Sequence, residues 1–149
     1  MPIYALLCGA AVIASIAGYE GYSDVAYLDS AGVPTIGYGT TQGIKLGDTI
    51  TREFATELLQ RDATYAGEAI KRCVSVPLYQ HEYDAYVSFA YNVGGAAFCS
   101  STLVKKLNAG DYVCACNELP RWVYAGGQRL RGLEIRREQE RRMCLGKPQ

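Results

Sequence analysis

The sequence predicts an α+β fold in which a mainly helical lobe is joined to a small antiparallel sheet lobe. Its 149 residues, of which 49% are hydrophobic, suffice for one globular domain that covers residues 1–149. β-prone segments are confined to residues 25–46, where turn residues separate them. Through most of the remaining chain, apolar residues recur at the spacing of a helix.

The first element is an apolar segment, residues 1–19, that contains no charged side chain. A secretory signal peptide starts with basic residues, whereas only the α-amino group is positive here. A transmembrane helix needs about 20 apolar residues, so this segment is at the short limit for entering a bilayer. Two interpretations remain open. The segment is either a membrane anchor used in export, or a first helix buried in the core through Leu6, Leu7, Val12, Ile13 and Ile16.

Residues 25–46 contain the short pieces VAYLD, VPTIGYGT and QGIKLGD, which predict a sheet built on a hairpin. Pro34 lies inside the second piece, and a residue without an N–H donor is tolerated only at a sheet edge or bulge. The sheet should therefore be small and exposed. Gly37 and Gly39 indicate backbone that turns or that another group approaches closely.

Helices are predicted after the sheet. Thr51 is a suitable N-cap for a long helix that reaches about Lys71. Pro77 interrupts the chain, and the apolar spacing after it predicts a central core helix that Gly94 stops. Shorter helices at residues 102–108 and 112–118 and an arginine-rich helix at residues 133–145 complete the lobe.

The distribution of charge along the sequence limits the classes of binding partner. The formal net charge is zero, yet residues 121–147 hold seven arginines and one lysine against three glutamates. This local excess suits the surface of an anionic polymer, and a solvated basic helix explains it equally well. Since no Lys/Arg tract is interleaved with aromatic residues, we expect no nucleic-acid partner.

Six cysteines form an even set, which indicates an oxidising compartment. Zinc is the competing explanation, but Cys114 and Cys116 are separated by one residue and His81 has no second histidine beside it. We therefore expect no metal site.

Two carboxyl groups are the candidates for chemistry. Glycoside hydrolysis uses one carboxyl group to protonate the leaving oxygen and a second to activate water or attack the sugar. Glu20 ends an apolar helix, where burial would raise its pKa as a general acid requires. Asp29 lies beside a polar turn that keeps it ionised, and Thr35 on the returning strand can hold the water. Taken singly, these residues are equally explained as a helix-end charge, a turn-starting residue and an ordinary strand residue.

The segment GYEGYSDVAYLDSAGVPTIGYGTT closely resembles the active-site signature of phage-type lysozymes, glycoside hydrolase family 24. The resemblance continues in VPLYQHEYDAYVSFAYNVGGAAFCSSTL and in RWVYAGGQRLRGLEIRREQERRMCL. It implies a lysozyme-like fold with the cleft between the lobes. It further implies that Glu20 is the general acid, Asp29 the general base and Thr35 the water-positioning residue of an inverting muramidase, with the carboxyls about 6.5–9.5 Å apart. The bond cleaved would be the β-1,4 bond between N-acetylmuramic acid and N-acetylglucosamine in peptidoglycan, leading to lysis of the host cell.

The same resemblance implies further substrate-binding candidates, which are Tyr38, Gly39, Asn92, Arg136 and Arg137. One of the two arginines would approach the acid glutamate, and we expect at least one of them to be a solvated surface residue. Asn92 would face the cleft or cap the central helix, and Tyr38 and Gly39 would border the sugar subsites. No cofactor is expected, and the partner would be the glycan strands of peptidoglycan, bound by a monomer.

Residues 3–17 resemble the weakly hydrophobic signal-anchor that many endolysins of phages infecting Gram-negative bacteria carry, although the usual spacer before the catalytic helix is missing. Such a segment enters the inner membrane and later leaves it. The resemblance implies export to the periplasm of the infected host, with a transient inner-membrane association that keeps the enzyme inactive while it is tethered. For the cysteines, we expect the pairs Cys73–Cys99 and Cys116–Cys144, which leaves Cys8 with Cys114.

Two other functions remain alternatives. A lytic transglycosylase cleaves the same glycan with one acidic residue and no water, so Asp29 and Thr35 would be dispensable. A catalytically inactive wall-binding protein could also use the same scaffold, although it would have no chemical need for Glu20, Asp29 and Thr35 together.

Overall fold

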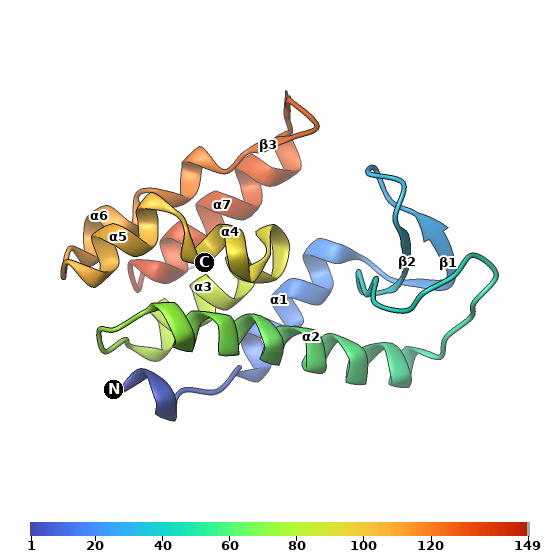
Figure 1. The fold of residues 1–149 in the computed structure, drawn as a ribbon, viewed down its shortest axis with the longest axis horizontal. Helices are drawn as coiled ribbons and strands as arrows, with labels where there is room; N and C mark the ends of the chain where they lie inside the picture. Colours follow the sequence, from blue (N-terminus) through green and yellow to red (C-terminus); the bar gives the residue numbers. More distant parts are fainter. Residues whose placement is uncertain (149) are drawn as a thin grey trace.

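The computed structural model describes residues 1–148, which form two lobes (Figure 1). The β1–β2 hairpin and its long loop lie at one end, and the helices from α3 onward gather at the other. Helices α1 and α2 run between the two. The elements are η1 (Ile3–Ala5), α1 (Ala10–Glu20), β1 (Ser23–Leu28), β2 (Pro34–Gly37), α2 (Arg52–Cys73), α3 (Gln80–Val93), α4 (Gly95–Cys99), α5 (Thr102–Asn108), α6 (Tyr112–Cys116), η2 (Leu119–Arg121), β3 (Tyr124–Ala125), β4 (Gln128–Arg129) and α7 (Arg131–Cys144).

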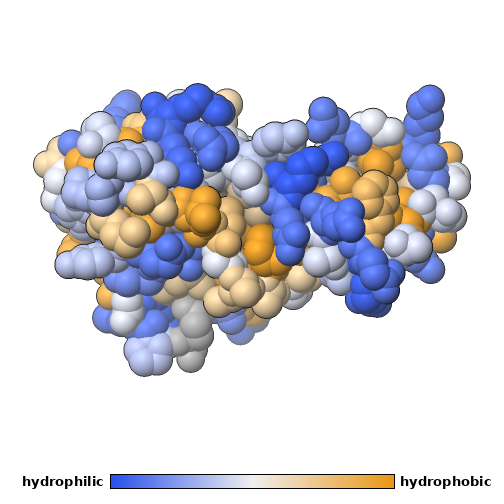
Figure 2. Space-filling model, turned by 90° about the horizontal axis from the view of Figure 1, so that it is seen from below, coloured by the Kyte–Doolittle hydropathy of each residue, from blue (hydrophilic) through white to orange (hydrophobic). Residues whose placement is uncertain are grey.

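The apolar N-terminal segment is not one helix. The 3-10 turn η1 is followed by an extended stretch, and α1 starts only at Ala10. Leu6, Val12 and Ile16 are completely buried, as a core helix requires, but Leu7 is 74% exposed and its expected burial is wrong. Ile13 is half-buried. Within residues 1–148, no helix combines the length and apolar character needed to cross a membrane. One face of the molecule carries apolar patches among polar and charged side chains (Figure 2).

The sheet lobe is smaller than the sequence predicts. β1 and β2 are antiparallel, with Tyr27 opposite Thr35 and Leu28 opposite Pro34. Pro34 begins β2, where its missing N–H donor is tolerated. Residues 42–47, expected to form a third β-prone piece, make turns instead, and Thr49 beyond them forms an isolated bridge to Val25.

The predicted helices are present with shifted ends. Thr51 caps α2, because its side chain accepts a hydrogen bond from the Phe54 N–H, and α2 continues to Cys73. The helix at residues 102–108 has the predicted bounds, whereas α6 ends at Cys116 and α7 begins at Arg131. Helix α4 and the β3–β4 hairpin were not anticipated.

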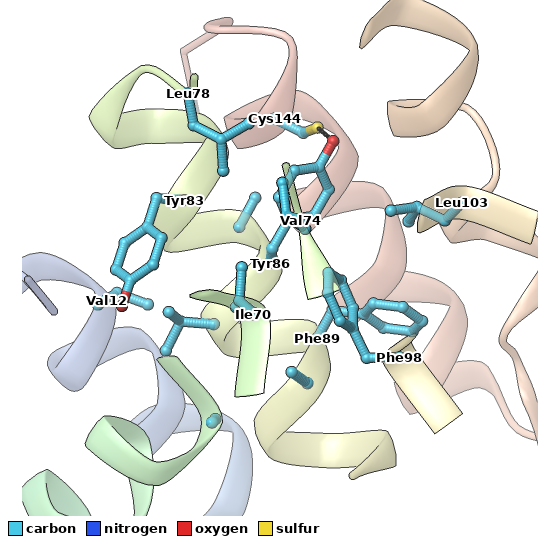
Figure 3. Close-up of a cluster of buried hydrophobic side chains, with 14 of the residues drawn as sticks. Val12, Ile70, Val74, Leu78, Tyr83, Tyr86, Phe89, Phe98, Leu103 and Cys144 are labelled. Carbon is cyan, nitrogen blue, oxygen red and sulfur yellow. Dashed lines mark hydrogen bonds between the residues drawn. The ribbon is translucent and has the colours of Figure 1, made fainter. Parts of the chain in front are cut away.

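The core of the helical lobe is built around α3. Tyr83, Tyr86 and Phe89 of this helix are almost completely buried (Figure 3), and α2 and α7 pack against it. The Phe98 ring of α4 lies against both Tyr86 and Phe89, with ring centroids 5.8 and 6.0 Å apart. Trp122 is half-buried, and its ring lies edge-on to Phe89.

Two disulfides tie this lobe together, Cys73–Cys99 and Cys116–Cys144. The third expected pair is wrong, because Cys8 and Cys114 are free thiols. Positions 114 and 116 point about 200° apart around a helix, so burial of Cys116 turns Cys114 to the outside of α6. Cys8 instead packs against α2, with its Sγ 3.5 Å from the Ala63 carbonyl oxygen.

Candidate active site

Glu20 is the last residue of α1. The helix stops there because Gly21 adopts a φ of +69°, in the left-handed region that favours glycine. The Glu20 side chain keeps 22% of its surface exposed. It is therefore partly buried at the point where α1 meets the sheet lobe, as the sequence predicts.

A buried arginine orients this carboxyl group. Nη1 of Arg136 donates to Glu20 Oε1 at 2.8 Å, Nε to Glu140 Oε1 at 3.1 Å and Nη2 to the Ser88 carbonyl at 3.0 Å. The guanidinium also lies 4.6 Å from the centre of the Tyr19 ring. Because all three nitrogens are engaged and the side chain is 5% exposed, Arg136 holds Glu20 in one orientation.

Arg137 lies deeper and does not face Glu20. It donates to Glu140 Oε2 at 2.6 Å, to the Trp122 carbonyl at 2.9 Å and to Asn92 Oδ1. Burial lowers the pKa of Arg137, and Glu140 acts in the opposite direction. The expectation that at least one of Arg136 and Arg137 is solvated at the surface is therefore wrong.

Asn92 accepts a hydrogen bond from Arg137 instead of capping α3, which ends at Gly94 with a φ of +92°. Most of the arginines between residues 121 and 147 form ion pairs, although only Arg136 and Arg137 are buried, and the side chains of Arg121 and Arg129 are 74% and 65% exposed. The paired arginines are Arg121, Arg129, Arg136, Arg137 and Arg141.

Asp29 follows β1 and is held by its own turn. Its N–H donates to the Val33 carbonyl at 3.0 Å, and its Oδ1 accepts from the N–H groups of Ala31 and Val33, both at 2.9 Å. Gly32, with a φ of +77°, closes the turn. The side chain is half-buried. The turn therefore fixes Oδ1 by local hydrogen bonds.

Thr35 lies on β2 opposite Tyr27, which precedes Asp29 by two residues. Thr35 is 4% exposed, and its hydroxyl donates to the Val33 carbonyl at 2.9 Å. The Asp29 N–H donates to the same carbonyl at 3.0 Å. The two residues are therefore linked through Val33.

The loop after β2 comes close to Glu20. Gly39 has a φ of +91°, and a Cβ added there would lie 3.1 Å from Glu20 Oε2. The neighbouring Tyr38 is fixed from two sides, because its hydroxyl accepts from Arg52 and its carbonyl accepts from the Tyr91 hydroxyl. Glycine is needed at position 39 because any side chain would crowd the carboxylate.

An open pocket of about 490 Å³ continues from Gly39 between the loop, α2, α3 and α4, and its lining includes Asp62, Tyr65, Tyr91 and Gly94. In residues 1–148, no cluster of His, Cys, Asp and Glu side chains is arranged to hold a metal ion. Gly39 therefore lies both beside Glu20 Oε2 and at the edge of this pocket.

Glu140 and Ser88 belong to the site although the sequence did not predict them. Glu140 is 1% exposed and contacts Arg136, Arg137 and Ser88. Its spacing of four residues after Arg136 is the signal that could have indicated the pairing. Ser88 carries no such signal, since a serine in the middle of a core helix has many explanations.

A two-lobed α+β fold with one carboxyl at the end of its first helix and another on a β-hairpin defines a lysozyme-like protein. The sequence matches the phage lysozyme family over residues 17–140, and the chain belongs to this family. It is 41% identical over 129 residues to the SAR-endolysin of Enterobacteria phage PA-2, an overlap of 86% of this chain and 78% of that protein. The chain is therefore a phage endolysin with lysozyme-type activity on peptidoglycan.

Solved structures show the same fold. The muramidase domain of SpmX from Asticaccaulis excentricus gives a TM-score of 0.87 at 32% identity, covering 94% of this chain and 98% of the domain. The active form of the P1 phage endolysin Lyz gives 0.82 at 28% identity, covering 93% and 85%. The secreted inactive form of Lyz gives only 0.58 at 26% identity, covering 70% and 75%.

Proposed function

We propose that this endolysin is an inverting muramidase that hydrolyses the β-1,4 bond between N-acetylmuramic acid and N-acetylglucosamine. In this mechanism Glu20 is the general acid, Asp29 the general base and Thr35 the residue that positions water. The observation that carries the proposal is the fixed orientation of Glu20 between Arg136 and the Gly39 loop. The neighbouring hairpin carries Asp29 and Thr35, which both donate to the Val33 carbonyl, Asp29 through its N–H and Thr35 through its hydroxyl. The SpmX relative is a muramidase domain, which agrees with this bond specificity.

The contacts assign an oxygen to each step. Oε1 of Glu20 is engaged by Arg136, and Oε2 faces Gly39, which also lines the pocket, so Oε2 would deliver the proton to the glycosidic oxygen. Oδ1 of Asp29 accepts the turn N–H groups, so Oδ2 would take a proton from the attacking water. The C–O bond to the leaving sugar breaks as the water oxygen bonds to the anomeric carbon, which inverts its configuration.

Glu20→Gln and Asp29→Asn test these roles. Loss of a general acid or base lowers the rate by a factor of about 10²–10⁴, measured as turbidity clearing of outer-membrane-permeabilised cells. Glu57→Gln, an exposed carboxyl on α2, is the control and should retain full activity. Product analysis should find reducing ends with inverted anomeric configuration. Anhydro-sugar products with an active Asp29→Asn would instead identify a transglycosylase, and full activity of Glu20→Gln would refute the acid role.

We also propose that residues 3–17 associate transiently with the inner membrane before the enzyme folds in the periplasm as a monomer. The names of the SAR-endolysin relatives support this. In an embedded segment, α1 could not pack against α3, and Glu20 would not reach Arg136. Membrane fractionation before lysis tests this proposal, which a completely soluble protein at every stage would refute.

A further inference from the structure

Helix α1, which carries Glu20 at its end, begins without a local cap. Its N-cap residue is Gly9, which has no side chain, and its first turn contains no acidic residue. The third helical position is Val12, which cannot reach back with a hydrogen bond. Because a helix leaves its first four N–H groups without partners inside the helix, the apolar N-terminal segment needs an acceptor from elsewhere.

Asp84 of α3 supplies this acceptor. The Asp84 carboxylate lies beside Gly9, because a Cβ added at Gly9 would be 3.6 Å from Oδ2 and 4.0 Å from Oδ1, and interaction with the Gly9 backbone lowers the pKa of Asp84. Gln80, one turn earlier on α3, donates through Nε2 to the Leu7 carbonyl at 2.9 Å and to Asp84 Oδ1 at 2.8 Å. Gln80 and Asp84 of α3 therefore both contact the backbone just before α1.

The N-terminus of α3 is also capped by a carboxylate, but this carboxylate belongs to α3 itself. Its N-cap N–H, on Tyr79, donates to the carboxylate of Glu82 at the third helical position, at 2.8 Å. Asp84 does for α1 what Glu82 does for α3, but from another helix. A carboxylate near the positive end of a helix dipole also adds a favourable electrostatic contribution. The N-terminus of α3 is therefore capped by a residue of α3 itself, whereas the N-terminus of α1 is capped by a residue of another helix.

The site retains a carboxylate despite its burial. Burial raises the pKa of Asp84, whereas the hydrogen bond from Gln80 and the interaction with the Gly9 backbone lower it. An ionised group in a half-buried position is costly unless hydrogen bonds compensate it. The groups that compensate Asp84 are those that fix the start of α1.

We propose that Asp84 is a positioning residue for Glu20. It caps α1 from α3 and, together with Gln80, fixes the N-terminal end of the helix, while Arg136 fixes the carboxyl group at the other end. The 11 residues of α1 span about 16 Å, so Asp84 acts through the helix and does not touch substrate. This inference rests on the proposed role of Glu20. It also means that the catalytic helix is complete only when Leu7 and Gly9 have docked on α3.

The test uses Asp84→Ala, Asp84→Asn and the double variant Asp84→Ala/Gly9→Ser. A serine at Gly9 can cap α1 locally, because Gly9 has the extended conformation of an N-cap (φ −77°, ψ 160°). Asparagine retains an acceptor oxygen and caps as well as aspartate. Asp111→Ala is the matched control, since Asp111 caps α6 through the Cys114 N–H.

Hydrogen exchange of α1 peptides and the separate values of kcat and KM are measured well below the melting temperature. For Asp84→Ala we expect roughly five-fold faster exchange in α1, the effect of losing one cap, and a lower kcat at unchanged KM, because Glu20 is less well oriented. Gly9→Ser should restore both, Asp84→Asn should keep both near wild type, and Asp111→Ala should leave kcat unchanged.

Unchanged α1 exchange in Asp84→Ala would overturn the proposal, as would a loss of kcat that Gly9→Ser does not restore although α1 is protected again. Faster exchange without any change in kcat would reduce Asp84 to a structural cap. The role of Glu20 itself is decided separately by Glu20→Gln, so failure of the two ideas can be distinguished.

Discussion

The two carboxyl groups of the site are held in opposite ways. Glu20 belongs to a cluster of two carboxylates and two guanidiniums in which Arg136, Arg137 and Glu140 are 5%, 1% and 1% exposed. Asp29 is held by N–H groups within four residues of itself. The helical lobe therefore fixes Glu20 by buried contacts between remote segments, whereas the hairpin fixes Asp29 locally.

This difference has energetic consequences. The four charges of the cluster balance one another, and each group depends on partners from α1, α3 or α7. Removing one partner leaves a buried charge uncompensated, which costs far more than the pair contributes. In the hairpin, a lost side-chain acceptor exposes backbone N–H groups that water can reach. The helical side should therefore be sensitive to substitution and the hairpin side tolerant.

The largest effect is expected for Glu140→Ala. It leaves Arg136 and Arg137 without their shared carboxylate, so the free energy of unfolding should fall by about 3–5 kcal/mol, measured by urea denaturation. Activity should fall as well, because Arg136 loses the contact that orients it toward Glu20.

Glu138→Ala is the matched control for this prediction. It lies two residues earlier on α7 and pairs with Arg141 at the surface, where its side chain is 48% exposed. An exposed pair contributes about 0–1 kcal/mol, so the loss should be small. Equal losses for the two variants would show that burial does not determine how much stability is lost when a carboxylate of α7 is removed.

A smaller effect is expected when the disulfide of α7 is removed. Replacing Cys116 and Cys144 by alanine removes a cross-link between residues 28 positions apart. Loss of a disulfide typically lowers the free energy of unfolding by about 2–4 kcal/mol. Cys114→Ser, at an exposed free thiol, is the control. Hydrogen exchange should accelerate in α6 and α7 but not in the β1–β2 hairpin, and faster exchange in the hairpin would contradict the independence of the two regions.

The same difference explains what could be predicted from the sequence. Local signals placed the hairpin, the turn at Asp29 and the Thr51 cap, because each depends on neighbouring residues. The end of α1 at Glu20 also follows from the adjacent Gly21. These features need only short-range chemistry, so one sequence suffices to predict them.

The errors at the site and at the N-terminus concern contacts between remote segments. At least one of Arg136 and Arg137 was expected at the surface, because nothing near Arg137 in the sequence indicates Asn92 or the Trp122 carbonyl as its partners. Leu7 was expected in the core because it lies in an apolar run, but the break before α1 turns it outward while the Leu7 carbonyl binds Gln80. The side-chain contacts between remote segments of the helical lobe could therefore be identified only from the structure.

The smallest effect on stability is expected for Asp29→Asn. Asparagine retains the oxygen that accepts from the Ala31 and Val33 N–H groups, so the free energy of unfolding should change by no more than about 0.5 kcal/mol. Asp29→Ala removes both hydrogen bonds and should cost about 1 kcal/mol or somewhat more. Urea denaturation of the two variants distinguishes the role of Asp29 in the turn from its proposed role in catalysis. Both variants lack the carboxylate, but only Asp29→Ala lacks the oxygen that accepts the turn hydrogen bonds. If Asn destabilised the hairpin as much as Ala, the charge of Asp29 would hold the turn, and the hairpin would depend on an ionic contact as the helical lobe does.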